Sequence, residues 1–133
     1  EAPVRTYVLD THALIWYLTR DERLSPAARQ AFREIERGEA RGLIPIVVLL
    51  ELIRIEEKEL IPPLWEAALA TLLGGGRFEV VPLDLNLLAL VRELPEIEDL
   101  HDRVIVAIAR RYGAVLVTYD EIIRRSGLVE TLW

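Results

Sequence analysis

The sequence predicts an α/β domain built around a short, mostly parallel central sheet. Two observations favour this fold class. Short strand-like runs alternate along the chain with longer segments in which apolar residues recur at helical spacing. The length of 133 residues, with 52% hydrophobic and 29% charged residues, is that of one compact domain with a sizeable core. The chain contains no internal repeat, low-complexity tract or linker.

The first elements follow from periodicity and capping residues. We expect a strand at residues 6–9 and a helix from about residue 12 to residue 18. Ser25-Pro26 predicts the start of a second helix, because Ser is a preferred N-cap and Pro is favoured in the first turn. The apolar face of that helix stops near Gly38, which ends it.

The remaining elements are bounded by Pro, Gly and a capping Asp. Pro62-Pro63 opens a helix that Gly74-Gly75-Gly76 ends, and Asp84 caps a helix that Pro95 ends. Gly113 ends the last long helix before a fourth strand. The expected segments are strands at 43–44, 78–81, 115–118 and 128–131, the last at a sheet edge, and helices at 46–57, 62–73, 84–94, 100–112 and 121–125.

Composition excludes several classes of function. The formal charge is -6, from 16 basic and 22 acidic residues, so a polynucleotide would have to be held by a local basic patch or by metal ions. The absence of Cys excludes disulfide, thiolate and zinc-cysteine chemistry and fits a reducing cytoplasm. The most apolar stretch, residues 43–50, is too short to cross a bilayer, and residues 1–5 lack the apolar core of a signal peptide. We therefore expect no membrane association.

Two acids follow predicted strands. Asp10 comes directly after the first strand and Asp120 after the fourth, and ligands of open α/β sheets bind outside the carboxyl ends of the strands. The alternative is that each is a helix N-cap, which for either acid alone is as good an explanation as a metal role. Two such acids together favour a site.

Three further acids lie in predicted helices. Glu51 interrupts a run of branched aliphatic residues; the alternative is a partly exposed helix residue near Arg54 or Lys58. Asp102 begins the last long helix, and Asp99 lies one turn before it, either near a metal or as an N-cap. Converging carboxylates would require a hard cation such as Mg2+ or Mn2+, because such cations prefer oxygen ligands.

Five motifs occur in an order that resembles the PIN-domain family, and among its members the VapC-type toxins of toxin-antitoxin pairs. The similarity extends over nearly the whole chain. The motifs are LDTHALIW at residues 9–16, LSPAA at 24–28, LE at 50–51, DLHDRVIVA at 99–107 and LVTYD at 116–120, and Leu132-Trp133 also fits the subgroup.

The resemblance implies a single PIN-like domain over residues 1–133 with a three-layer α/β/α fold. It implies an endoribonuclease that hydrolyses single-stranded or loop RNA with Mg2+ or Mn2+. It also implies a cytoplasmic homodimer silenced by a cognate antitoxin protein. The residue roles that carry over are catalysis for Asp10, Glu51, Asp102 and Asp120, metal binding for Asp10, Asp102 and Asp120, and support for Asp99, Thr11 and Thr118.

The chain departs from the subgroup in two places. Residues 45–50, before Glu51, are wholly apolar where small polar residues are usual, and residues 97–102 carry fewer basic groups than usual. Arginines are the candidates for an RNA-binding rim, with a solvated surface role as the alternative for each. The candidates are Arg20 and Arg103, followed by Arg110, Arg111, Arg124 and Arg125.

Two readings compete with a nuclease. A receiver-like signalling domain would need paired acids after the first strand and a Lys after the last, and the chain supplies neither. A PIN-like domain without activity would serve as a metal-binding interaction module. The two histidines, His12 and His101, have no metal-ligand spacing with one another, and we expect structural or surface roles for both.

Overall fold

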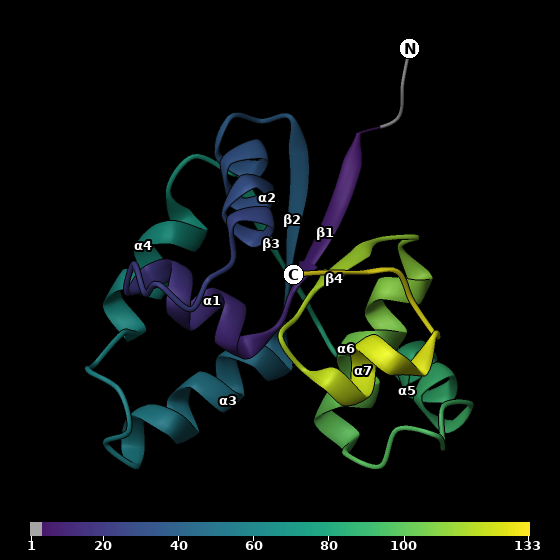
Figure 1. Ribbon diagram of the computed structural model, residues 1–133. Coiled ribbons are helices and arrows are strands. Elements are labelled where there is room, and N and C mark those ends of the chain that lie inside the picture. The colour runs from purple at the N-terminus through teal and green to yellow at the C-terminus, as the bar shows by residue number, and fades with distance from the viewer. Residues whose placement is uncertain (1–3) are drawn as a thin grey trace.

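The computed structural model describes residues 4–133 and shows a five-stranded sheet with helices on both faces (Figure 1). The strand order is β3-β2-β1-β4-β5, and every pairing is parallel, so the sheet expected to be mostly parallel is wholly parallel in the described part of the chain. The expectation that residues 1–5 form no signal peptide concerns mainly residues 1–3, which lie outside the described residues. The strands are β1 (Arg5–Leu9), β2 (Ala40–Pro45), β3 (Phe78–Val81), β4 (Val115–Val117) and β5 (Thr131–Leu132).

The helices form the two outer layers, which confirms the predicted α/β/α sandwich. Helices α1, α2 and α4 lie on one side of the sheet and α5, α6 and α7 on the other, while α3 extends from the end of β2 (Figure 1). None of the helices among residues 4–133 has the length and apolar character needed to cross a membrane. The helices are α1 (Thr11–Leu18), α2 (Pro26–Glu36), α3 (Ile46–Glu57), α4 (Trp65–Leu73), α5 (Leu85–Arg92), α6 (Leu100–Arg111) and α7 (Glu121–Ser126).

Strand β1 lies at the centre of the sheet, and the later strands are added on both sides of it. From β1 the next strands are added on one side, as β2 and β3, and the last strands on the other, as β4 and β5. Val8 lies between Leu43 of β2 and Leu116 of β4, and the backbone N–H of Asp10 donates to the carbonyl of Val117 at 3.1 Å. The carboxyl ends of β1 and β4 are therefore neighbours at a topological switch point, where open α/β sheets place their ligands.

Burial of both sheet faces explains why the central strands are continuously apolar. Val8 and Leu9 of β1 and Leu116 and Val117 of β4 are fully buried. Helix α6 packs on β1, β2 and β4, with all of residues 104–109 buried. Because β4 follows α6 after a short turn and runs parallel to β1, the first turn of α6 lies at the carboxyl edge of the sheet.

Three predicted starts were wrong: the strand expected at 43–44 is Ala40–Pro45, and the other two have local reasons. The helix expected from residue 62 begins at Trp65, because the carboxylate of Glu56 accepts the N–H groups of Leu64 at 3.0 Å and Trp65 at 3.2 Å and fixes the start there. The edge strand expected at 128–131 is Thr131–Leu132. Gly127, with φ of 70°, ends α7 in a left-handed turn, and the chain reaches β4 only at Glu130.

Candidate active site

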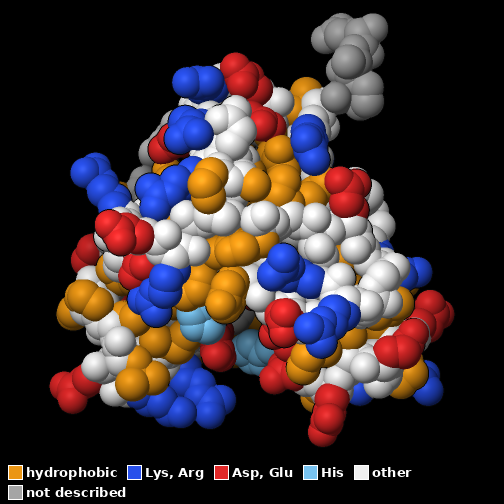
Figure 2. Space-filling model, in the orientation of Figure 1, with side chains coloured by type: hydrophobic (Ala, Val, Ile, Leu, Met, Phe, Trp, Pro, Cys, Tyr) orange, Lys and Arg blue, Asp and Glu red, His pale blue; other side chains and the backbone are white. Residues whose placement is uncertain are grey.

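A cavity of about 950 Å³ opens at the carboxyl edge of the sheet, beside the switch point. In Figure 2 acidic and histidine side chains gather where the lower half of the surface is hollowed. The cavity lies between the strand ends on one side and α3 and α6 on the other. Its lining includes all five acids singled out from the sequence: Asp10, Glu51, Asp99, Asp102 and Asp120.

Asp10 is held rigidly at the end of β1. Its carboxylate accepts the backbone N–H of Thr11 at 2.7 Å and the hydroxyl of Thr118 at 2.6 Å. Burial raises the pKa of Asp10, and these two hydrogen bonds oppose that rise because they favour the charged form. Thr118 supports Asp10 through its hydroxyl, whereas Thr11 supports it through the backbone.

The same threonine also positions Asp120. The backbone N–H of Asp120 donates to the hydroxyl oxygen of Thr118 at 3.0 Å, and the Asp120 carboxylate caps α7 by accepting the N–H of Ile123, also at 3.0 Å. Asp10 likewise caps α1. The N-cap role considered as an alternative for both acids is therefore present, and it coexists with their place in the cavity lining.

Asp102 of α6 also bears electrostatic strain. The pKa of Asp102 is raised to about 7, first by burial and then by the negative charges of Asp10, Asp99, Asp120 and Glu51. Like charges that are close enough to raise a neighbour's pKa favour either a retained proton or a bound cation. The acid cluster is thus one electrostatic unit.

Asp99 and the two histidines complete this half of the cavity. Asp99 is the N-cap of α6, where its carboxylate accepts the N–H of Asp102 at 3.2 Å. His101 approaches Glu51 with its Nδ1 atom 3.9 Å from a carboxylate oxygen. His12 and His101 both line the cavity, although the sequence suggested only structural or surface roles. Each lies two residues after an acid, Asp10 or Asp99, and this was the signal that could have found them.

The cations that line the cavity are not the arginines proposed from the sequence for an RNA-binding rim. Arg20 has left-handed backbone geometry, with φ of 54°, and lines a separate groove between α1, α2 and α4. Arg103 turns its guanidinium back to the carbonyl of Ile97. None of the six arginines proposed from the sequence for the rim is among the residues that line this cavity.

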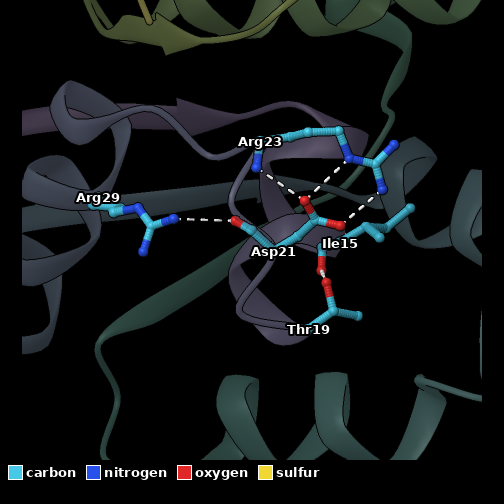
Figure 3. A network of polar contacts seen from close by, with 5 residues as sticks. All are labelled: Ile15, Thr19, Asp21, Arg23 and Arg29. Atoms are coloured by element: carbon cyan, nitrogen blue, oxygen red, sulfur yellow. Dashed lines mark hydrogen bonds and ion pairs between the residues drawn. The ribbon is translucent and has the colours of Figure 1, made fainter.

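The cations that do line the cavity are Arg23, Arg54 and Lys58. Arg54 and Lys58 follow Glu51 by three and seven positions, the spacing of one helix face, so their placement was readable from α3. Arg23 is held by Asp21 through two hydrogen bonds to its side chain (Figure 3). Its placement depends on a loop conformation that the sequence pattern does not reveal.

The donor set fits a hard divalent cation. Among residues 4–133 no three Asp, Glu or His side chains are arranged as a ready-made metal cage. Mg2+ rarely needs one, because it keeps several water ligands and is bound through one or two carboxylates together with substrate phosphates. The crowding of carboxylates in the lining and the raised pKa of Asp102 are what such a cation would relieve.

The chain belongs to the PIN-domain family: the model of that family, described as PIN domain, matches residues 7–127. No curated protein matches the chain significantly. Solved structures share the fold over almost their entire length at low sequence identity.

One similar chain is from VapBC2 of Rickettsia felis bound to a promoter DNA fragment, with a TM-score of 0.71 and 18% identity, covering 96% of this chain and 97% of that one. A second, from DNA-bound VapBC of Salmonella typhimurium, has a TM-score of 0.69 and 23% identity, with 96% and 97% covered. A third, from a toxin-antitoxin complex of Klebsiella pneumoniae, has a TM-score of 0.60 and 14% identity, with 92% and 94% covered.

Proposed function

We propose that this protein is a metal-dependent endoribonuclease and the toxin of a type II toxin-antitoxin pair, acting as one domain. The observation that carries the proposal is the convergence of five carboxylates on one cavity at the switch point of a PIN fold. A bound Mg2+ or Mn2+ would neutralise charge on a phosphodiester and lower the pKa of an attacking water. We also propose a cytoplasmic location, which the lack of Cys in the sequence fits.

We assign the residues by how each is held. Asp10, Asp102 and Asp120 would hold the cation, with Asp10 and Asp120 oriented by the hydroxyl of Thr118. Glu51 faces them from α3 as the fourth catalytic acid. Asp99 would support the site through its cap on α6.

The basic side chains that line the cavity would offset the repulsion between its acids and RNA. An acidic cavity repels a polyanion, and the whole chain carries a formal charge of -6. Arg54 and Lys58 on α3 and Arg23 in the loop after α1 line the same cavity as the acids. These side chains would receive the phosphates on either side of the cleaved bond.

The test is cleavage of a single-stranded RNA by purified protein with Mg2+, with Mn2+ and with a chelator. Asp10→Asn and Asp120→Asn should each abolish metal-dependent cleavage, because the amide is nearly isosteric but loses the charge that holds a cation. Expression of the native chain should slow bacterial growth, and expression of the Asp10→Asn variant should not.

Asp84→Asn is the matched control. Asp84 caps α5 through the N–H of Leu87 at 2.8 Å, as Asp120 caps α7, but it lies outside the cavity, and Asn caps equally well. Cleavage should survive this substitution. Failure of the native protein to cleave RNA with either metal, or equal cleavage by Asp10→Asn, would refute the nuclease proposal.

The protein partners are part of the proposal. One structural neighbour is described as a toxin-antitoxin complex, which supports an antitoxin as partner of this chain. Helix α3 buries Leu49 and Leu52 but leaves Leu50 and Ile53 exposed, an apolar edge suited to a homodimer. Light scattering of the native protein and of Leu50→Glu tests the dimer: the native mass should be that of two chains and should halve in the variant.

The alternative is a catalytically silent, metal-binding interaction domain. The exposed apolar side chains of α3, Leu50 and Ile53, are the observation in favour of an interaction role. A protein that is stabilised by Mg2+ but cleaves no RNA would establish this alternative.

A further inference from the structure

Three aromatic rings meet beside the acids. They come from separate parts of the chain: Trp16 from α1, Tyr119 from the loop between β4 and α7, and Trp133 from the residue after β5. The ring centroids are 5.5 Å apart for Trp16 and Tyr119, 5.6 Å for Trp16 and Trp133, and 5.5 Å for Tyr119 and Trp133. All three contacts are edge-to-face, so the rings hold one another in fixed orientations.

Core packing accounts for only part of this cluster. Trp16 is 6% exposed and belongs to the core, whereas Tyr119 is 58% exposed and still lines the acidic cavity. Its neighbours in sequence are both fixed: Thr118 is fully buried and bonded to Asp10, and Asp120 caps α7. The open ring of Tyr119 is therefore held at a set position relative to the carboxylates.

A guanidinium lies on the same cluster. The central carbon of Arg23 is 4.8 Å from the ring centroid of Trp16. Its Nε and Nη2 atoms donate to the two oxygens of Asp21 at 3.0 and 2.7 Å, which leaves Nη1 outside this pair of bonds (Figure 3). The side chain is 67% exposed and lines the cavity, so a fixed cation stands next to the aromatic surface.

We propose that Tyr119, backed by Trp16 and Trp133, is a stacking platform for an unpaired base of the RNA next to the cleaved phosphodiester, and that Arg23 contacts a phosphate of the same segment. This rests on the proposed function, because it assumes an RNA at the acidic cavity. An aromatic ring and a cation side by side are the combination by which proteins hold single strands, since every unpaired base offers a face for stacking. The platform would make the site select single strands over duplex.

The test measures binding separately from cleavage. Native protein in Ca2+ is titrated into a short single-stranded RNA that carries 2-aminopurine, whose fluorescence is quenched on stacking. Tyr119→Ala should weaken binding about 5- to 100-fold, the usual loss for one stacked base, and should remove most of the quenching. Tyr119→Phe should bind as the native protein does. Tyr119→Leu keeps apolar bulk without an aromatic face and should behave as Tyr119→Ala.

The matched control is Tyr112→Ala. Tyr112 is also an exposed tyrosine, at 39%, but it lies at the end of α6 and outside the cavity, so its loss should leave RNA binding unchanged. Arg23→Gln should weaken binding and reduce the dependence of log affinity on log salt by about 0.7, the slope of one phosphate contact to a single strand.

The outcomes separate the platform from the nuclease. The platform is overturned if Tyr119→Ala or Tyr119→Leu binds as tightly as the native protein, if duplex RNA of the same sequence binds as well as the single strand, or if the native protein causes no quenching. If Tyr119→Ala still cleaves RNA with an unaltered KM, the platform proposal is refuted and the nuclease proposal is retained. Stacking by a native protein that cleaves nothing would support the platform and remove the nuclease.

Discussion

The two sides of the acidic cavity are built differently. On the strand side, Asp10 and Asp120 accept hydrogen bonds from backbone N–H groups, and both are joined to the hydroxyl of Thr118. On the helix side, the carboxylates of Glu51 and Asp102 have no comparable anchors in the described part of the chain, and the nearest partner is His101 at 3.9 Å from Glu51. The strand side is fixed by hydrogen bonding, whereas the helix-side carboxylates lack such bonds. Burial raises the pKa of Asp10 as well as that of Asp102, so both sides carry charge that is costly to bury, but only the strand side is anchored by hydrogen bonds.

The largest effect is expected on the fixed side. Thr118→Val removes a fully buried hydroxyl that bonds both Asp10 and the N–H of Asp120. The unfolding free energy should fall by about 1–3 kcal/mol, because the buried carboxylate of Asp10 loses one of its two hydrogen bonds. Metal-dependent activity should fall by about 10- to 100-fold. Urea denaturation and RNA cleavage measure the two effects.

Thr11→Val is the control for that substitution, since Thr11 supports Asp10 through its backbone N–H, which Val retains. Its effect on both readouts should be small. Equal losses from the two substitutions would show that the strand side is not organised by the Thr118 hydroxyl.

The second effect concerns the strained side and depends on pH. The folded-state pKa of Asp102 is about 7, above that of an unfolded Asp, near 3.9. The contribution of Asp102 to the stability of the metal-free protein is therefore fully present below about pH 4, and it is lost as pH rises through 7. Asp102→Asn should flatten the fall in stability between pH 5 and pH 8, measured by denaturation in a chelator.

Asp84→Asn should leave that slope unchanged, because the hydrogen bond from Leu87 lowers the pKa of Asp84 and its titration lies below this window. A native protein equally stable at pH 5 and pH 8 without metal would contradict the strained helix side.

The third effect joins the two sides through the proposed cation. At about ten times its dissociation constant, Mg2+ or Mn2+ should stabilise the native protein by about 1.4 kcal/mol through preferential binding to the folded state. The gain should increase with pH, because protons and cations compete for the same carboxylates. Thermal melts with and without metal at pH 6 and pH 8 measure it. If metal leaves the melting temperature unchanged, the acid cluster does not bind the cation.

The smallest effect is expected at Asp99, which borders the helix side. Asp99→Asn should change stability by only a few tenths of a kcal/mol, because Asn is as good an N-cap as Asp. Asp99→Ala should cost about 1 kcal/mol, since α6 loses its cap. Activity should decline less in Asp99→Asn than in Asp10→Asn. A complete loss of cleavage in Asp99→Asn would place Asp99 among the catalytic acids.

The sequence predicted the fold and the acids because both leave local signals. A carboxylate directly after a buried strand is visible at Asp10 and Asp120, and Glu51 is visible as a charge among aliphatic residues. Each of these signals depends on backbone periodicity alone. All three acids line the cavity, while their roles in metal binding and catalysis stay predictions.

The cations were harder to predict because their positions depend on tertiary structure. Arg20 and Arg23 are three residues apart in one loop, and only the left-handed backbone at Arg20 and the bonds between Arg23 and Asp21 decide which one reaches the acids. The start of α4 was missed for a similar reason, since its N–H groups are bonded by Glu56 from the preceding helix.

The hydrogen bond between Thr118 and Asp10 spans 108 positions of sequence, and this distance sets the order in which the protein can mature. Since a chain emerges from the ribosome N-terminus first, Asp10 and Glu51 exist long before Asp102, Thr118 and Asp120 do. A nascent chain that has been made only through β3 has no α6 to cover the sheet and no β4 to align with β1. Translation products that end before α6 therefore lack the assembled acid cluster, whatever the state of the strands already made.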